Sequence, residues 1–323
     1  MRLLYALERS DLLIKATLGG IKDFLALALA CSARALSRLF WRRVPYRCAA
    51  GSLRPLATIR AVLGASLVSD EVARANAAFL LGIKMRKHHH GALWARKQCL
   101  EKSAYHCEPT LIADIRDCGK MLRSYVAEVC PGRPVIFAPL HTVSDRIAAV
   151  VCTLGPARHA AIVSAYIAGT SGKDELNIVA AVGGRLDRLV AADLKGAELR
   201  HHIRAVTEGR VNLVVFPDAL PEFTNAMAGR SMRTRKIEIF RRHGRLHTAV
   251  EMLSRTSNAV AVYFALHEAE GRLGIDILGH LNCSEIESSE ASIIEAAVCK
   301  HWRFWLLWHC GSLFYMNPAT AYE

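Results

Sequence analysis

The sequence predicts an α/β fold with a mostly parallel central sheet flanked by helices, preceded by a helical N-terminal extension. Two observations support this fold class. From residue 132 onward, short apolar runs of the length typical of buried strands alternate with longer stretches of helical character. Before residue 130 the chain is rich in Ala, Leu and Val, without the alternation of a half-buried strand. Strands that alternate with helices form parallel sheets covered on both faces.

The extension is expected to span residues 1–55 and to associate with a membrane. A run of Leu, Ala and Phe from Phe24 to Ala30 follows Lys22 and precedes several arginines. This run is too short to span a bilayer as it stands. An apolar stretch beside basic residues is typical of an interfacial helix, and an ordinary core helix is the alternative that the sequence leaves open. Because no linker or internal repeat follows, residues 56–323 are expected to form one α/β domain.

The elements after the extension are expected in a simple order. Residues 56–130 are expected to be helical. The predicted strands are the apolar runs Val135–Leu140, Ala160–Tyr166, Ile178–Val182, Val211–Phe216, Ala259–Leu266 and Leu273–Leu278. The predicted helices between them include Leu194–Glu208 and His247–Arg255. The stretch from Ile237 to the second of these helices is expected to be a loop.

The net charge of the chain indicates which class of partner it binds. The 323 residues include 42 Lys and Arg against 29 Asp and Glu, which gives a net charge of +13 at pH 7. A surplus of this size favours anionic partners, such as phospholipid headgroups or an acidic carrier protein. The basic residues form no long block, and the aromatic residues do not interleave with them. Nucleic acid is therefore not expected to be a partner.

The ten cysteines indicate a reducing compartment rather than a disulfide framework. No Cys-x-x-Cys pair occurs, and no spacing is typical of a zinc site. The adjacent residues His88, His89 and His90 point in different directions on a helix. They are expected to form a solvated basic surface, so no metal cofactor is expected.

The main candidate for chemistry is His141, which directly follows the first predicted strand, with Asp145 four residues later. If a helix begins after the strand, Asp145 lies one turn on and faces back toward His141. A carboxylate that binds one imidazole nitrogen leaves the other nitrogen basic, as a general base requires. The alternative for an isolated pair of this kind is a structural His beside a helix cap.

Two later segments place polar residues near the same edge of the sheet. Asp193 and Lys195 precede a predicted helix, where Asp193 is expected to cap the helix and Lys195 to attract an anion. Phe216-Pro217-Asp218 ends another apolar strand. Because ligands bind at the carboxyl ends of parallel strands, Asp218 is expected to share a cleft with His141. A capped surface helix and an ordinary Pro-Asp turn are the simpler alternatives.

The densest basic tract of the chain follows Asp218. It consists of Arg230, Arg233, Arg235, Lys236, Arg241, Arg242 and Arg245. The tract is expected to face phosphates or a bilayer, and a solvated basic loop is the alternative.

Together these segments resemble the late acyltransferases of lipid A biosynthesis, the lauroyl and myristoyl acyltransferases, a branch of the lysophospholipid acyltransferase superfamily. The resemblance covers residues 60–315, most of the chain. The matching segments are Gly132-Arg133 with the strand to His141, then Asp193–Gly196, Phe216-Pro217-Asp218, Leu253-Ser254-Arg255 with the following strand, and the aromatic segment with Trp305, Trp308 and His309.

The resemblance implies an enzyme at the cytoplasmic face of a bacterial inner membrane. It implies transfer of a fatty acyl group from an acyl carrier protein or coenzyme A thioester to a hydroxyl or amine. The acceptor would be a lipid A-like glycolipid, a lysophospholipid or a small biosynthetic intermediate. His141 would act as general base with Asp145 orienting it, and no resident cofactor is required. The residues expected to bind substrate are Arg146, Lys195, Asp218 and Arg255.

The chain departs from the family pattern around these residues. The acid follows His141 at the fourth position instead of the fifth, which holds Arg146. Ala191 stands where the family carries an arginine, and Ala219 where it carries a histidine. A second hypothesis is therefore a catalytically silent relative that binds lipid or an acyl carrier protein.

Overall fold

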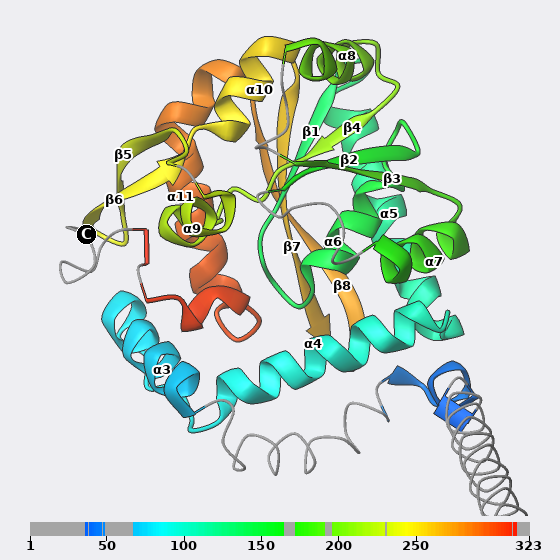
Figure 1. Ribbon diagram of the computed structural model, residues 1–323, viewed down its shortest axis with the longest axis vertical. Coiled ribbons are helices and arrows are strands. Elements are labelled where there is room, and N and C mark those ends of the chain that lie inside the picture. Colours follow the sequence, from blue (N-terminus) through cyan, green and yellow to red (C-terminus); the bar gives the residue numbers. More distant parts are fainter. Residues whose placement is uncertain are drawn as a thin grey trace, which may run out of the picture.

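The computed structural model describes residues 36–37, 39–46, 48, 67–164, 172–190, 196–229, 231–311 and 313–314. They form a mostly parallel six-stranded sheet flanked by helices, which confirms the α/β fold class (Figure 1). Most of the predicted extension lies outside the described residues, so the extension and the division at residue 55 stay predictions. Within the described part of the chain, no helix combines the length and apolar character needed to cross a bilayer.

The elements keep the order of the chain. The helices are α3 (Leu67–Leu81), α4 (His89–Tyr105), α5 (Pro109–Val129), α6 (Asp145–Cys152), α7 (Gly172–Val182), α8 (Gly196–Thr207), α9 (Pro221–Ala228), α10 (Ala249–Ser257), α11 (Cys283–His301) and the 3₁₀ helix η2 (Leu306–His309). The strands are β1 (Val135–Pro139), β2 (His159–Ser164), β3 (Arg185–Val190), β4 (Asn212–Val214), β5 (Thr234–Ile239), β6 (Arg242–His247), β7 (Val260–Ala269) and β8 (Arg272–Leu281).

The order of strands in the main sheet is β3-β2-β4-β1-β7-β8. Neighbouring strands are parallel except for β7 and β8, which are antiparallel. The central strand β1 pairs with β4 on one side and with β7 on the other. Parallel strands have their carboxyl ends at one edge, where ligand sites of such sheets lie. His141 lies two residues after the last residue of β1 and is therefore at this edge.

The strand β1 is apolar on both faces. Val135 and Phe137 pack in a core with α5, α6 and α7, whereas Ile136 and Ala138 pack in a second core with α8, α10 and α11. In Figure 1, α10 and α11 lie to the left of the sheet and α5 to α7 to its right. Strands buried on both faces have continuous apolar sequences, which is why this strand is recognisable from the sequence.

The predicted strand Ile178–Val182 is wrong, because these residues form the end of helix α7. Ile178, Val179 and Val182 are buried in the core, and periodicity alone does not distinguish a short buried helical segment from a buried strand. The strand in this region is β3, at the edge of the sheet. Its Arg185, Asp187 and Arg188 interrupt the apolar pattern that would have predicted it.

The strands β5 and β6 form a separate antiparallel hairpin where the sequence predicts a loop. Ile237, Ile239 and Leu246 of this hairpin pack into a third apolar cluster with α3, α11 and η2. Lys236 and Arg245 lie opposite each other in the hairpin and are exposed. The predicted loop is therefore wrong. The basic residues that alternate with the apolar ones made the two strands hard to recognise from the sequence.

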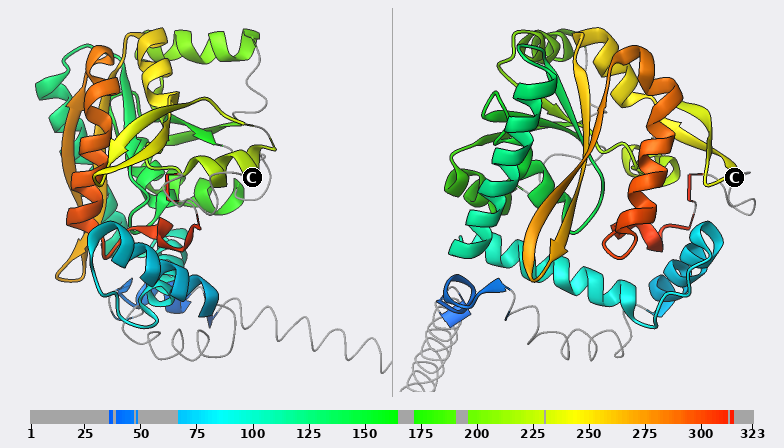
Figure 2. Two further views of the ribbon diagram at one scale, coloured as in Figure 1. Left: turned by 90° about the vertical axis from the view of Figure 1, so that its left-hand side faces the viewer. Right: turned by 180° about the vertical axis from the view of Figure 1, so that it is seen from behind.

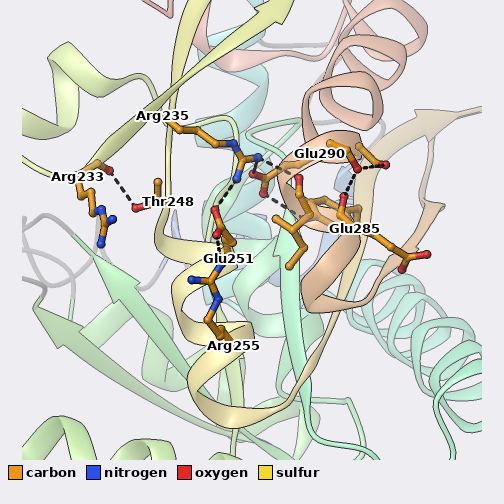
Figure 3. A network of polar contacts seen from close by, with 11 residues as sticks. Arg233, Arg235, Thr248, Glu251, Arg255, Glu285 and Glu290 are labelled. Atoms are coloured by element: carbon orange, nitrogen blue, oxygen red, sulfur yellow. Dashed lines mark hydrogen bonds and ion pairs between the residues drawn. The ribbon is translucent and has the colours of Figure 1, made fainter.

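A buried polar network fixes this hairpin to the main domain (Figure 3). Arg235 of β5 donates hydrogen bonds to Glu251 of α10 at 3.0 Å and to Glu290 of α11 at 2.8 Å. The Tyr263 hydroxyl of β7 donates to Glu290 at 3.1 Å. Burial raises the pKa of Glu290 to about 7, although Arg235 and Tyr263 act in the opposite direction. The network therefore joins four elements around one carboxyl group.

Candidate active site

A pocket lies at the carboxyl ends of β1, β2 and β4, with α4 crossing below the sheet (Figure 1). It contains about 1300 Å³ of empty space, part of which is continuous with solvent. Its walls are largely apolar and carry a few polar groups, as small-molecule sites usually do. The lining residues are Trp94, Lys97, His141, Asp145, Arg146, Ile162, Val163, Ser164, Arg188, Val215, Phe216, Pro217, Ala219, Leu220, Phe223, Thr224, Met232, His247, Ala249, Val250, Leu306, Leu307 and His309.

The imidazole of His141 is bound by Asp218, which follows β4. The distance from His141 Nδ1 to Asp218 Oδ1 is 2.9 Å. Asp218 also accepts hydrogen bonds from the His141 backbone N–H and, at 2.8 Å, from the indole N–H of Trp305. The indole and backbone groups are obligatory donors, so Asp218 is an acceptor and Nδ1 carries the proton. The second ring nitrogen, Nε2, then holds the basic lone pair.

The pair is asymmetric in its exposure. The Asp218 side chain is 0% exposed, whereas the His141 side chain is 20% exposed and lines the pocket. The ring of Phe216 lies against the His141 ring, with 4.4 Å between the ring centroids. A buried acid, an aromatic wall and one open ring nitrogen are the arrangement that a general base needs.

The segment around His141 is also held by the C-terminal part of the chain. Leu306 N–H donates to the His141 carbonyl at 2.8 Å, and Val143 N–H donates to the Phe304 carbonyl at 3.0 Å. Val143 adopts a left-handed backbone conformation, with φ of 57°, which is costly for a β-branched residue. Such strain persists only where surrounding contacts impose it, and it is common at functional sites. The turn after β1 is therefore a rigid platform for His141.

The sequence-based role of Asp145 is corrected by its contacts. Asp145 is the first residue of α6 and forms an ion pair with Lys97 of α4 instead of a bond to His141. Ser144 caps α6 by accepting a hydrogen bond from Ile147 N–H, which starts the helix too late for Asp145 to turn back onto His141. Burial would raise the pKa of Asp145, but Lys97 and, less strongly, His141 lower it below its usual value.

Lys97 is a charged residue of the pocket that the sequence did not single out. Its ammonium lies 4.6 Å from the centroid of the Trp94 ring, and Asp145 and Glu101 are its acidic partners. These contacts hold the ammonium group at the pocket wall. A lysine in a predicted helix gives no local signal of such a role, because its partner Asp145 is distant in the sequence.

The residues predicted to bind substrate lie in different parts of the structure, and not all of them line the pocket. Arg146 lines the pocket, and its guanidinium lies 3.5 Å from Glu101. Asp218 is sealed beneath His141 and supports the imidazole, so its assignment as a substrate-binding residue is wrong. Arg255 is exposed in the last turn of α10, pairs with Glu251 and does not line the pocket. Lys195 lies outside the described residues.

Two further imidazoles line the pocket. His247 of β6 is hydrogen-bonded to Thr224 of α9, and His309 of η2 is hydrogen-bonded to the Leu306 carbonyl at 3.0 Å. Burial lowers the pKa of both rings, with the Arg233 carbonyl opposing it at His247 and the Leu306 carbonyl at His309. Of these contacts, the sequence indicated only the aromatic segment that contains Trp305 and His309.

Within the described residues, no group of three or more His, Cys, Asp or Glu side chains is arranged to hold a metal ion. A scan of protein-family models and a search of curated proteins returned no match to this chain.

Proposed function

We propose that this protein is a membrane-associated acyltransferase that moves a fatty acyl group from an acyl thioester to a hydroxyl or amine acceptor. The observation that carries the proposal is the pair of His141 with the buried Asp218 at the wall of a largely apolar pocket. The apolar wall suits an acyl chain, and the imidazole suits the activation of a weakly acidic acceptor.

In this mechanism, His141 Nε2 accepts the proton of the acceptor O–H or N–H as that atom attacks the thioester carbonyl. The new bond to carbon forms a tetrahedral oxyanion, which collapses as the carbon–sulfur bond breaks. The imidazolium then returns its proton to the leaving thiolate, so protons and electrons balance. Asp218 stabilises the imidazolium during this cycle, as a buried carboxylate does in other acyl-transfer sites.

The oxyanion needs donors that are in place before it forms. Lys97 is the group best suited to this role, because Asp145 and Trp94 hold its ammonium at the same pocket that His141 lines. On this account, Asp145 contributes to the site by positioning Lys97. This role accounts for an acid that follows His141 closely in sequence and yet makes no bond to its ring.

The acyl donor is proposed to be an acyl carrier protein or coenzyme A thioester. The acceptor is proposed to be a lipid A-like glycolipid, a lysophospholipid or a small biosynthetic intermediate. Lysine and arginine side chains at the pocket, Lys97, Arg146 and Arg188, suit the phosphate groups that such donors and many such acceptors carry. The net charge of +13 suits work at an anionic membrane surface, at the cytoplasmic face of a bacterial inner membrane.

A catalytically silent relative that binds lipid or an acyl carrier protein is the competing hypothesis. It predicts binding without turnover. The open pocket and the oriented imidazole favour the enzyme, because a binding protein has no need for an imidazole bound to a buried carboxylate that the His141 backbone N–H and the Trp305 indole hold in place.

Turnover of acyl thioesters distinguishes the acyltransferase from the catalytically silent relative. Purified protein is incubated with fatty acyl thioesters of different chain length, and thiol release is followed with and without lipid, alcohol and amine acceptors. We expect thiol release that depends on an acceptor and is lost in His141→Ala. Binding of acyl thioester with no thiol release under any acceptor would support the silent relative, and release that persists in His141→Ala would remove His141 from the mechanism.

A further inference from the structure

The hairpin β5–β6 has two different faces because successive side chains of a strand point to opposite sides. Arg235, Ile237 and Leu246 point inward to the network and the apolar cluster described above. Lys236 and Arg245 form a directly opposed pair on the outer face, and both are exposed. The exposed Glu238 lies on the same face, two residues nearer the turn. Because directly opposed like charges repel each other, the end of this face that carries Lys236 and Arg245 suits an anionic partner.

This outer face leads into the pocket. Arg245 and His247 lie two residues apart on β6 and point to the same side, about 7 Å apart along the strand. His247 lines the pocket and is hydrogen-bonded to Thr224 of α9. The basic face of the hairpin and the pocket wall are thus one continuous surface.

Helix α9 supplies apolar side chains beside the same opening. Phe223 lines the pocket and is 37% exposed, and Met227, one turn later on the same side of the helix, is 39% exposed. Apolar side chains that are exposed together beside basic residues and a pocket can contribute to an interaction surface. The left-hand view of Figure 2 shows the hairpin and α9 side by side at this side of the molecule.

We propose that an anionic bilayer binds to this surface, which we call the docking face and define as Phe223, Met227, Lys236, Arg241 and Arg245. Arg241 lies in the turn of the hairpin and is exposed. The basic residues contact lipid phosphates, and the α9 side chains enter the interface between headgroups and acyl chains. The pocket that holds His141 then opens toward the bilayer.

The combination of charge and apolar exposure favours a bilayer over an acidic protein. Helix α9 presents its exposed Phe223 and Met227 beside the basic residues of the hairpin, and apolar side chains next to cations suit the interface of an anionic bilayer. Binding of the docking face to a bilayer requires no catalysis. Only the kind of substrate that enters the pocket from the bilayer rests on the proposed function.

The test is co-sedimentation of the full chain with phosphatidylcholine vesicles, with and without phosphatidylglycerol. We expect binding that depends on phosphatidylglycerol and decreases with added salt. In the double variant Lys236→Glu with Arg245→Glu, binding is expected to weaken at least thirtyfold, since each basic residue near an anionic surface contributes about fivefold. Met227→Ser is expected to weaken binding by a smaller factor.

The matched control is Lys120→Glu with Arg123→Glu. These residues lie on α5, which is on the other side of the sheet from the hairpin (Figure 2). This control makes the same change in net charge and is expected to weaken binding much less. Equal weakening by the two double variants would mean that net charge alone drives binding, and it would overturn the docking face.

Hydrogen exchange reports membrane contact segment by segment, so a second membrane contact elsewhere in the chain does not hide the contact at the docking face. We expect amide exchange in β5, β6 and α9 to slow when phosphatidylglycerol vesicles are present, with α5 unchanged. Vesicle binding with no protection at the hairpin and α9 would overturn the proposal. The proposal would also be overturned if the Lys236 and Arg245 double variant still bound vesicles but no longer cross-linked to an acyl carrier protein. Thiol release measured in parallel in detergent reports on catalysis separately.

Discussion

Of the imidazole–carboxylate pairs among the described residues, two have nearly equal distances between the partners and opposite surroundings. His141 lies 2.9 Å from Asp218, and His301 lies 2.8 Å from Asp276. In the first pair the acid is sealed and the imidazole faces a pocket. In the second pair the acid is 23% exposed and the imidazole only 6%. The distance between the partners is therefore a poor guide to function, and the direction of exposure distinguishes the pairs.

The partners of each acid explain the difference. Asp218 is bound by a backbone N–H and by the Trp305 indole, which are neutral donors that leave its charge to act on His141. Asp276 shares its charge between His301 and Lys300, with Lys300 in solvent. Burial tends to raise the pKa of Asp276, but these two partners lower it overall. The second pair is thus a structural contact that anchors the end of α11 to β8.

The largest effect expected from this comparison is on activity. His141→Ala is expected to lower kcat by roughly 10²–10⁴-fold, the usual contribution of a general base. His301→Ala removes the same side chain from the second pair and is expected to leave kcat within a fewfold of the wild type. The measurement is thiol release from an acyl thioester with an acceptor present. A comparable loss in both variants would mean that the two pairs are not distinguished by exposure.

A second comparison concerns the indoles of Trp305 and Trp308, which pack against each other with 4.7 Å between ring centroids. The Trp305 N–H binds Asp218, whereas the Trp308 N–H binds the Trp302 carbonyl. Trp305→Phe and Trp308→Phe each remove one buried hydrogen bond and are expected to cost about 1–3 kcal/mol of stability.

Only the first of these two variants is expected to lower kcat, because it removes one of the donors that hold Asp218 and so loosens the imidazole. Thermal unfolding and thiol release measured on both proteins check this. Equal activity in the two variants would show that the Trp305 contact has no part in positioning His141.

Another carboxyl group, Glu290 of the network at the hairpin, is buried like Asp218 and has a raised pKa. Its pKa is raised to about 7 in the folded protein, mainly by burial, from 4.5 for an ordinary Glu. The folded state then binds more protons than the unfolded state between these values. Glu290 therefore adds stability below pH 4.5 that is lost progressively as the pH rises through 7, on the order of 3 kcal/mol at most.

Glu290→Gln is expected to remove this part of the pH dependence. The free energy of unfolding is measured by urea denaturation of wild type and variant across this range. The difference between the two proteins should change steadily with pH, and a constant difference would mean that Glu290 titrates normally.

The fold was largely predictable because the strands of a parallel sheet are continuous apolar runs. Val135–Leu140 and Ala259–Leu266 appear in the structure as β1 and β7. The errors have one physical origin, since tertiary contacts override local pattern. The buried end of α7 resembles a strand in sequence, and the basic residues of β5 and β6 conceal one.

The site was predictable only in part. The position of His141 at the end of a strand was clear from sequence, and so was the proximity of Asp218 by the rule for carboxyl ends of parallel strands. Which acid binds the imidazole was not, because Asp218 is 77 residues away and Asp145 only four. Local spacing favours the near acid, but the start of α6 turns it toward Lys97, which no local signal identifies.

The most direct test compares the two acids. Asp218→Asn keeps the shape of the side chain and removes the charge behind His141, and Asp145→Asn does the same beside Lys97. With thermal unfolding used to confirm that both variants fold, kcat is measured with one acyl thioester and one acceptor. We expect Asp218→Asn to lose on the order of 10²–10⁴-fold and Asp145→Asn less than about tenfold. A larger loss in Asp145→Asn, or full activity in Asp218→Asn, would contradict the assignment of Asp218 as the acid that serves His141.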